Sequence, residues 1–433
     1  MTELGTAPST LTAPRPPAPA DGTDRSRSRR AGRLRRASVL CTAATALLLA
    51  AFSSTAGAAV AEEKPSPSVA QAEIPAGVTA GVAVFDRQTG TFTEQVNSAG
   101  QFRSASVVKL LIALDLLWNR TPADLPAADR ARVEAMLRSS DDAAASHFWA
   151  NYGSGAIIDR MVPRLGLTDT ARPPATHPGY WGYTALSARD TVKIYRYLLD
   201  SAPAAVRDYV LGALRQSTRC ATDGYDQHFG IAGSFDRPWA VKQGWSGFSS
   251  GGCTATTGAA TRNADGADGA DARAAAPGEK ASASGQRAES GAEAVDLARP
   301  ALHTTGVVGA GDRSIVSVFT LHPTGTAYGK AYTDLGRLTR SLNVPGATRP
   351  AGTWIGTWGS GIRIRGEATT AATALTTLPA GVEVLVRCQK RGQQVSVPPY
   401  VNEWWAYLPQ YGGYMSNIYL SSPDNQVPGV PEC

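Results

Sequence analysis

The sequence predicts an α+β domain, in which helices surround an antiparallel sheet, followed by a small all-β barrel. Strand-like apolar segments lie at both ends of residues 74–342, and the segments between them have helical spacing. The first strands are therefore expected to pair with the last ones. After a Pro/Gly linker at 343–352, residues 353–433 contain short alternating segments separated by turns, which is typical of a barrel.

The amino terminus accounts for most of the net charge of +6, because residues 1–61 contain eight arginines and only three acids. A basic stretch, a short apolar run and the small residues Ala59-Val60-Ala61 follow in the order typical of a secretory signal. We expect cleavage after Ala61, a tether at 62–73 and a secreted, extracellular protein without a membrane anchor after signal removal. The nearly neutral remainder does not indicate a nucleic-acid partner.

The first domain begins with a buried strand at 77–86 and its hairpin partner at 91–96. Residues 102–114 have helical apolar spacing, which places Ser106 in the first turn of a buried helix and Lys109 three residues later. Residues three apart share a helix face, so the amine can reach the hydroxyl. A desolvated lysine beside a serine is a plausible base for a serine nucleophile. By itself, this pair is weak evidence, and a serine cap with a snorkelling lysine is the simpler explanation.

The remaining elements follow from periodicity and from Gly/Pro punctuation. Helices are expected at 126–137, from about 140, and at 157–165, 187–199, 203–214 and 330–342, and strands at 239–247, 301–308 and 314–321. Residues 168–183 form a Pro/Gly/Tyr-rich loop. Residues 254–294 are low in large apolar residues and are expected to be a disordered insertion.

Four cysteines follow the predicted signal, and an even number in an exported chain indicates two disulfides. Sequence proximity pairs Cys220 with Cys253 and Cys388 with Cys433; the alternative is that some are free thiols. The five histidines are scattered and no Cys-x-x-Cys occurs. We therefore expect neither a metal site nor a cofactor.

Three motifs occur in order: Ser106-x-x-Lys109 on a helix, Ser140-Asp141-Asp142 at a helix start, and Lys242-Gln243-Gly244 on a strand. In this order they resemble the motifs of the penicillin-recognising serine hydrolases, and in particular the class A β-lactamase branch. The resemblance covers residues 73–342. The second motif can also be framed at Ser139, but Ser140 keeps the Ser-Asp pair of the family.

The resemblance implies roles for these residues. Ser106 would be the acylated nucleophile, and Lys109 the base or proton relay. Ser140 would pass a proton to the leaving nitrogen, and Lys242 would hold the substrate carboxylate. The backbone N–H groups of Ser106 and Trp245 would form the oxyanion hole. The substrate-binding residues would be Asp142, Gln243, Gly244 and Trp245.

Three departures from the family pattern bear on function. Asp142 replaces an asparagine, and Gln243 replaces a hydroxyl residue. Residues 166–189 contain no glutamate, which class A β-lactamases use for deacylation; Asp169 is the acid nearest to that place. A stable acyl-enzyme with β-lactam or peptidoglycan-stem amides is therefore the leading hypothesis. The alternatives are a true β-lactamase with rapid turnover and a catalytically decayed cell-wall-binding protein.

The C-terminal part contains short strand-like segments at 361–365, 380–384 and 404–408, followed by glycines and aromatics at 412–415. On these segments it resembles bacterial SH3-like domains. Such modules accompany wall enzymes and bind peptidoglycan, so the resemblance implies association with the cell wall. Trp404 and Trp405 are either part of this binding surface or, in the simpler interpretation, one core residue and one incidental residue.

Overall fold

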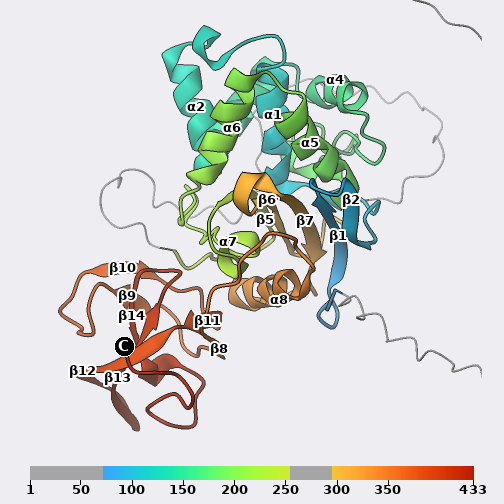
Figure 1. Ribbon diagram of the computed structural model, residues 1–433. Coiled ribbons are helices and arrows are strands. Elements are labelled where there is room, and N and C mark those ends of the chain that lie inside the picture. The colour runs from blue at the N-terminus through green and yellow to red at the C-terminus, as the bar shows by residue number, and fades with distance from the viewer. Residues whose placement is uncertain (1–71, 254–294) are drawn as a thin grey trace, which may run out of the picture. The chain divides into compact units, whose positions relative to one another are not determined.

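The computed structural model describes residues 72–253 and 295–433 (Figure 1). The predicted signal at 1–61, nearly all of the tether at 62–73 and the insertion at 254–294 lie outside the described residues. No helix in the described ranges is long and apolar enough to cross a membrane.

The first part of the chain is built on a five-stranded antiparallel sheet in the order β2-β1-β7-β6-β5. Its strands are β1 (Thr79–Asp86), β2 (Thr91–Val96), β5 (Trp239–Ser246), β6 (Ala301–Val308) and β7 (Ser314–Leu321). The first strand pairs with the last one along its whole length, from Thr79 opposite Leu321 to Asp86 opposite Ser314. The prediction that the first hairpin joins the last strands is therefore confirmed.

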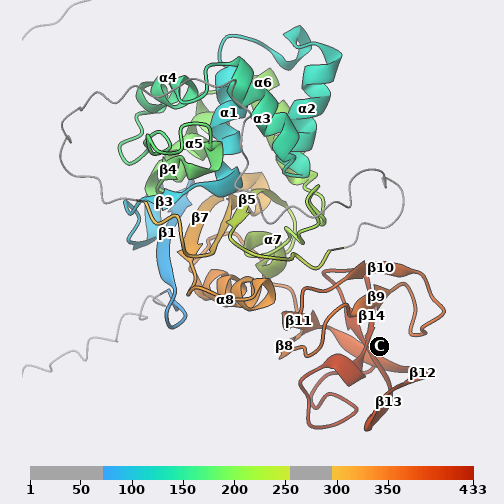
Figure 2. The ribbon, with the colours of Figure 1, turned by 180° about the vertical axis from the view of Figure 1, so that it is seen from behind.

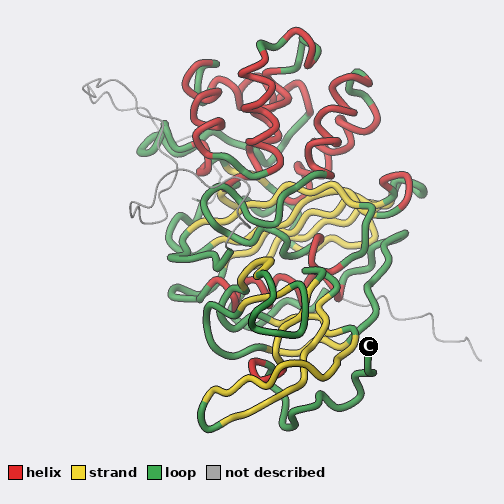
Figure 3. Tube along the Cα trace, turned by 90° about the vertical axis from the view of Figure 1, so that its left-hand side faces the viewer, coloured by secondary structure: helices red, strands yellow, loops and turns green. Residues whose placement is uncertain are grey.

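The strands β1, β5, β6 and β7 are buried on both faces, because side chains alternate along a strand and both sets lie inside the protein. On β1, Ala83 and Phe85 pack into one core while Val82 and Val84 pack into the other. Helices cover each face, as Figure 3 shows for the strands between the helical layers. The predicted α+β class is confirmed.

The larger helical layer consists of α1 (Lys109–Leu116), α2 (Ala127–Arg138), α3 (Asp142–Asn151), α4 (Ala156–Leu165), α5 (Ala188–Asp200) and α6 (Ala204–Arg215). The opposite face is covered by α7 (Ile231–Ser234) and α8 (Tyr328–Ser341). Figures 1 and 2 show these two layers from opposite sides.

The start of the predicted helix at 102–114 was wrong. Phe102–Arg103 form a short strand, β3, that pairs with β4 (Ala185–Leu186). Ser106 lies in a 3₁₀ turn over Ala105–Val108, and α1 begins only at Lys109. The strand, the turn and the helix are all buried, so all three are rich in apolar residues. Apolar spacing therefore could not show where the helix begins.

The C-terminal part is all-β apart from a 3₁₀ turn at Asn417–Tyr419, among its described residues. Its strands are β8 (Thr353–Gly356), β9 (Arg363–Arg365), β10 (Ala374–Thr377), β11 (Glu383–Val386), β12 (Cys388–Val397), β13 (Tyr400–Leu408) and β14 (Gly413–Ser416). They form one sheet in the order β10-β9-β14-β13-β12 and the pair β11-β8. The all-β prediction is confirmed, whereas the SH3-like assignment stays a prediction.

Both predicted disulfides are present. Cys220 pairs with Cys253 and Cys388 pairs with Cys433, with Cα–Cα distances of 5.6 and 5.0 Å.

Trp404 and Trp405 are both buried, so neither forms an exposed binding surface. The second ties β13 to its neighbour by donating from its indole nitrogen to a backbone carbonyl of β12.

Candidate active site

Ser106 occupies a tightly packed turn between β3 and α1. Ala105, just before it, has φ of 45°, a left-handed conformation that alanine rarely adopts. The turn lies directly against β5, since a Cβ on Gly244 would be 2.9 Å from the carbonyl oxygen of Ser104. Glycine is therefore required at the last position of the third motif so that the strand can approach the nucleophile turn.

Lys109 is fully buried and lies at the centre of the site. Its Nζ donates to Ser106 Oγ at 2.9 Å, to the Ser140 carbonyl at 2.6 Å and to Asp142 Oδ1 at 2.5 Å. Ser140 Oγ is a further acceptor at 3.3 Å. The lysine thus joins the first motif to the second, and its charge is paired with the carboxylate of Asp142.

Lys242, on β5, connects the third motif to the other two. Its Nζ is 2.8 Å from Ser140 Oγ and 3.0 Å from the Gln243 carbonyl. Burial, followed by the charge of Lys109, lowers the pKa of Lys242 well below its usual value. Ser106, Lys109, Ser140 and Lys242 therefore form one continuous chain of polar contacts through the protein interior.

The structure places Ser140, and not Ser139, in this chain. The hydroxyl of Ser139 instead accepts from Thr218 at 3.2 Å. Ser140 has φ of 55°, which turns it out of the preceding helix. The helix cap that offered a simpler explanation for this motif is Asp141, whose carboxylate accepts from the Ala144 N–H at 2.7 Å. Capping therefore leaves the Ser140 hydroxyl available to the two lysines.

The sequence led us to expect a direct contact between Gln243 and the substrate, but the structure shows its side chain bound within the protein. Its amide nitrogen donates to the backbone carbonyls of Gln227 at 3.0 Å and Phe229 at 2.8 Å, and the side chain is buried. Successive side chains of a strand point to opposite faces, so Gln243 points away from Lys242. It is a positioning residue that holds the neighbouring segment against β5.

Trp245 carries its side chain into the wall of the site. Its indole packs against Tyr225 and Phe229, and its Nε1 donates to Asp223 Oδ2 at 2.9 Å. Asp223 is exposed on one side, yet the surrounding protein, followed by the charge of Asp142, raises its pKa. Sequence reasoning missed Asp223; the available signal was the Cys220–Cys253 pairing, which brackets the third motif.

Trp181, in the loop before α5, contacts Lys109. It is a second residue that sequence reasoning missed. The Lys109 Nζ is 4.7 Å from the centre of the indole ring, and the indole Nε1 donates to Ser146 Oγ at 3.2 Å. Asp169 has a structural role instead. Desolvation raises its pKa, but hydrogen bonds from Arg189 and Ser187 outweigh this and lower it below the usual value.

Comparisons with known proteins give partial matches, and no protein-family model matches the chain. Proteins described as "Putative lipoprotein LppW" from Mycobacterium bovis and Mycobacterium tuberculosis are 41% identical over 175 residues, which is 39% of this chain. The chain spans about half the length of these curated relatives, 54%.

Two solved structures are examples of those to which the chain is similar. PBP-A has 14% identity and a TM-score of 0.41, covering 62% of this chain and 90% of that protein. A class A β-lactamase from Mycobacterium abscessus has 15% identity and a TM-score of 0.40, covering 61% and 92%. At these identities and TM-scores, no activity is transferred to this chain.

Proposed function

We propose that this protein is a serine acyl-hydrolase that forms a covalent acyl-enzyme on Ser106. The observation that carries the proposal is the buried chain of contacts in which Lys109 Nζ lies 2.9 Å from Ser106 Oγ and continues through Ser140 to Lys242. A nucleophile, an adjacent amine and a third group that orients the amine are the parts that acyl transfer requires.

In the acylation step, Ser106 Oγ attacks the substrate carbonyl and forms a new C–O bond. The hydroxyl proton passes to Lys109 Nζ while Lys109 gives one of its own protons to Ser140 Oγ, and the Ser140 hydroxyl proton passes to Lys242. The lowered pKa of Lys242 favours its neutral, proton-accepting form. As the bond to the leaving group breaks, Ser140 returns a proton to it. The backbone N–H groups of Ser106 and Trp245 would stabilise the oxyanion.

Deacylation is expected to be slow. Residues 166–189 contain no glutamate, and Asp169 is engaged by Arg189 and Ser187. Trp181 covers Lys109 on this side, where a hydrolytic water would need a base. A long-lived acyl-enzyme with a β-lactam or a peptidoglycan-stem amide therefore fits these residues better than a β-lactamase with rapid turnover.

We place the protein outside the cytoplasm, in contact with the cell wall. The predicted secretory signal, the two disulfides and the lipoprotein description of its mycobacterial relatives support an envelope location. In the C-terminal part, Trp358 and Tyr400 are exposed and their rings lie 6.1 Å apart. This pair, rather than Trp404 and Trp405, is the aromatic surface that we propose for wall binding by an SH3-like domain.

Intact-protein mass spectrometry with benzylpenicillin tests the proposal. Wild type is expected to gain the mass of the drug and to keep it for minutes to hours, whereas Ser106→Ala gains nothing. Ser139→Ala is the matched control, because this neighbouring serine lies outside the chain of contacts and should leave acylation intact.

Fast loss of the adduct with accumulation of product would instead identify a β-lactamase. An intact fold that reacts neither with penicillin nor with a fluorophosphonate would favour the non-catalytic, wall-binding alternative. Asp142 and Gln243 motivate that alternative, because both depart from the family pattern.

A further inference from the structure

We propose that this protein has a second binding site, away from Ser106, and that its ligand is the phosphate monoester of a small organic group. The site is an open pocket between the C-terminal ends of α1 and α3 and one side of α4. The inference goes beyond the proposed acyl-hydrolase function and does not depend on it.

The pocket has the size of a small-molecule site. Its volume is about 470 Å³, within the range in which proteins hold organic ligands. Helices α1 and α4, whose side chains line it, lie side by side (Figure 1). Its main lining residues are Asp115 near the end of α1, Trp118 and Arg120 after it, Tyr152 directly after α3, and Arg160 and Arg164 on α4.

The pocket lies at the far ends of two helices that begin in the candidate active site. Lys109 is the first residue of α1, and Asp115 follows six residues later, which is about 9 Å along a helix axis. Asp142 is the first residue of α3, and Tyr152 directly follows its last residue. A ligand in the pocket would therefore not occupy the space in front of Ser106.

The charge of the pocket is positive. Asp115 pairs with Arg160 at 2.5 Å and with Arg164 at 2.8 Å, and its side chain is only 5% exposed. One carboxylate thus faces two guanidinium groups, and Arg120 adds a third. With three arginines and one acid among its lining residues, the pocket has a net charge of about +2 and attracts anions.

Each of these arginines keeps N–H groups that can bind an anion. Arg160 uses Nε and Nη2 for Asp115, and Arg164 uses Nη1. Among the residues that the structure describes, no hydrogen-bond partner contacts Arg160 Nη1, Arg164 Nη2 or the guanidinium of Arg120. Arginines bind the several oxygens of a phosphate through paired N–H groups. A phosphate monoester, with nearly two negative charges at neutral pH, matches both the net charge and these donors.

Aromatic rings hold two of the arginines in place and supply an apolar wall. The Arg164 guanidinium lies 4.8 Å from the centre of the Trp118 ring, and the Arg120 guanidinium lies 5.7 Å from the centre of the Tyr152 ring. Stacking on a ring orients a guanidinium and leaves its N–H edge open. Trp118 is itself stacked on Tyr197 at 5.0 Å. The organic part of the ligand would pack against the half-buried rings of Trp118 and Tyr152.

Stabilisation of helix ends explains only part of this arrangement. Arg160 donates to the Tyr152 carbonyl at 2.7 Å, and Arg164 lies in the last turn of α4, where a cation is favourable. Arg120 lies beyond the end of α1 and is exposed, and in the described ranges no carboxylate pairs with it. Replacement of Arg120 therefore tests for the ligand without removing a contact that holds a helix end.

Isothermal titration calorimetry of the full mature chain with phenyl phosphate tests the proposal. Wild type is expected to bind phenyl phosphate, to bind inorganic phosphate about two- to tenfold more weakly because the ring contact is missing, and not to bind phenol. Arg120→Gln should weaken the binding of phenyl phosphate about tenfold, because a charge and its donors are lost. Arg207→Gln, which removes an arginine on α6 that pairs with Asp208, is the matched control and should bind like wild type.

Vesicles of phosphatidylcholine, with and without phosphatidic acid, distinguish a lipid headgroup from a soluble ester. Co-sedimentation that requires phosphatidic acid and is lost in Arg120→Gln would identify a lipid as the source of the phosphate. Binding of phenyl phosphate without co-sedimentation would identify a soluble ester.

Three results would each overturn the inference. They are no binding of either phenyl phosphate or phosphatidic acid vesicles, equal binding by wild type and Arg120→Gln, and loss of binding in a folded Lys242→Gln variant, which would place the anion beside Ser106. Circular dichroism verifies that each variant is folded. Penicillin acylation is measured on the same proteins and should be unchanged in Arg120→Gln; its absence from wild type would overturn only the proposed function.

Discussion

At the scale of single residues, the site depends on how each polar atom is paired. Lys109 and Lys242 are both buried, yet their surroundings differ. Lys109 contacts the carboxylate of Asp142 at 2.5 Å. Lys242 contacts a hydroxyl and a backbone carbonyl, and its burial near another cation favours loss of its proton. The two lysines are therefore suited to different parts of proton transfer.

The pH dependence of acylation follows from Lys242. Its pKa lies well below the usual 10.5, so the neutral amine is already available well below that pH and is lost only on acidification. The acylation rate should rise with pH and then level off earlier than an exposed lysine would allow. Rates measured across the pH range by penicillin adduct formation would show this; a rate still rising near pH 10 would contradict it.

Lys242→Arg should slow acylation by about 10²- to 10⁴-fold, because a guanidinium stays protonated and cannot accept the proton. The measurement is the same single-turnover reaction at neutral pH. Lys330→Arg, an exposed substitution on α8, is the matched control. A Lys242→Arg enzyme that acylates at the wild-type rate would remove Lys242 from the relay.

At the scale of elements, the loop before α5 lies against the Ser106–Lys109 pair and bears on the proposed deacylation step. In this segment, the Trp181 indole lies over Lys109 and its nitrogen donates to Ser146 on α3. The loop acid, Asp169, is bound by Arg189 and Ser187 at the start of α5. The element that would supply a base for hydrolysis thus supplies an apolar cover.

Trp181→Ala should shorten the lifetime of the penicilloyl adduct by about tenfold, since removal of the indole admits water beside Lys109; tenfold corresponds to about 1.4 kcal/mol in the barrier. Trp181→Phe keeps much of the cover and should resemble wild type. Decay of the adduct followed by mass spectrometry gives the lifetimes. An adduct equally stable in all three proteins would show that Trp181 does not limit deacylation.

The C-terminal tail is an element that depends on a disulfide. Gln389 holds the tail through the carbonyls of Val427 and Val430, and the Cys388–Cys433 bridge closes a segment with a sequence separation of 45. Replacing both cysteines by serine should lower the free energy of unfolding by about 4 kcal/mol according to the loop-closure relation. Urea unfolding of oxidised wild type and the double variant measures this. Equal midpoints would mean that the hydrogen bonds alone hold the tail.

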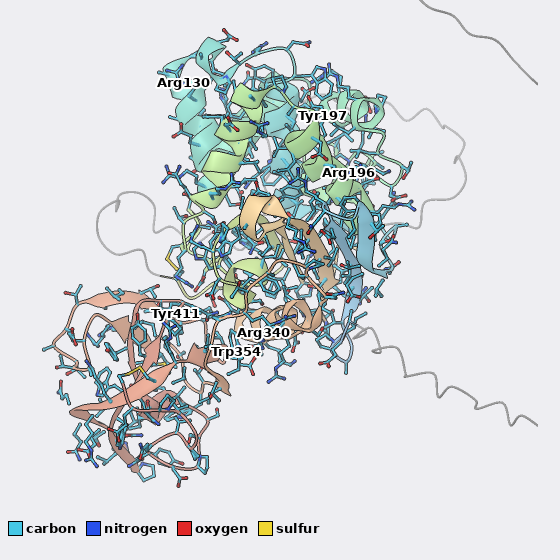
Figure 4. All side chains as sticks on the ribbon, in the orientation of Figure 1. Arg130, Arg196, Tyr197, Arg340, Trp354 and Tyr411 are labelled. Atoms are coloured by element: carbon cyan, nitrogen blue, oxygen red, sulfur yellow. A yellow bond between two sulfur atoms is a disulfide. The ribbon has the colours of Figure 1, made fainter. Side chains whose placement is uncertain are left out.

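At the scale of the whole molecule, the segment that forms the site wall also contacts the C-terminal part. Arg219 pairs with Asp226 and stacks on Tyr411 at 4.0 Å. On α8, Arg340 stacks on Trp354 at 3.7 Å (Figure 4). Asp223 lies between Arg219 and Asp226 in the sequence, so these contacts hold in place the segment that carries its carboxylate.

Wall binding is the prediction at this scale. Trp358→Ala and Tyr400→Ala should each weaken co-sedimentation with isolated cell walls about two- to tenfold, which corresponds to an aromatic contact of about 0.5–1.5 kcal/mol. Acylation of Ser106 should be unaffected. Ile74→Ala, which removes an exposed apolar side chain from the first part of the chain, is the control. Undiminished binding of both aromatic variants would place the wall contact elsewhere.

Features set by local pattern and composition could be determined from the sequence alone. They include the α+β class, the pairing of the first hairpin with the last strands, the two disulfides, and Ser106 beside Lys109. Each depends on apolar periodicity, on the number of cysteines or on residues three positions apart. These quantities can be obtained from the sequence itself, without knowing which distant segments are in contact.

Only the tertiary structure decided which polar atoms meet. Ser140 contacts Lys242 across a separation of 102 residues, and a backbone twist at Ser140 selects it over Ser139. Long-range contacts also bound the Gln243 amide to the carbonyls of Gln227 and Phe229, placed Trp181 over Lys109 and brought Asp223 to Trp245. Hydrogen bonds and burial between distant segments determine these positions, and periodicity along the chain does not encode them.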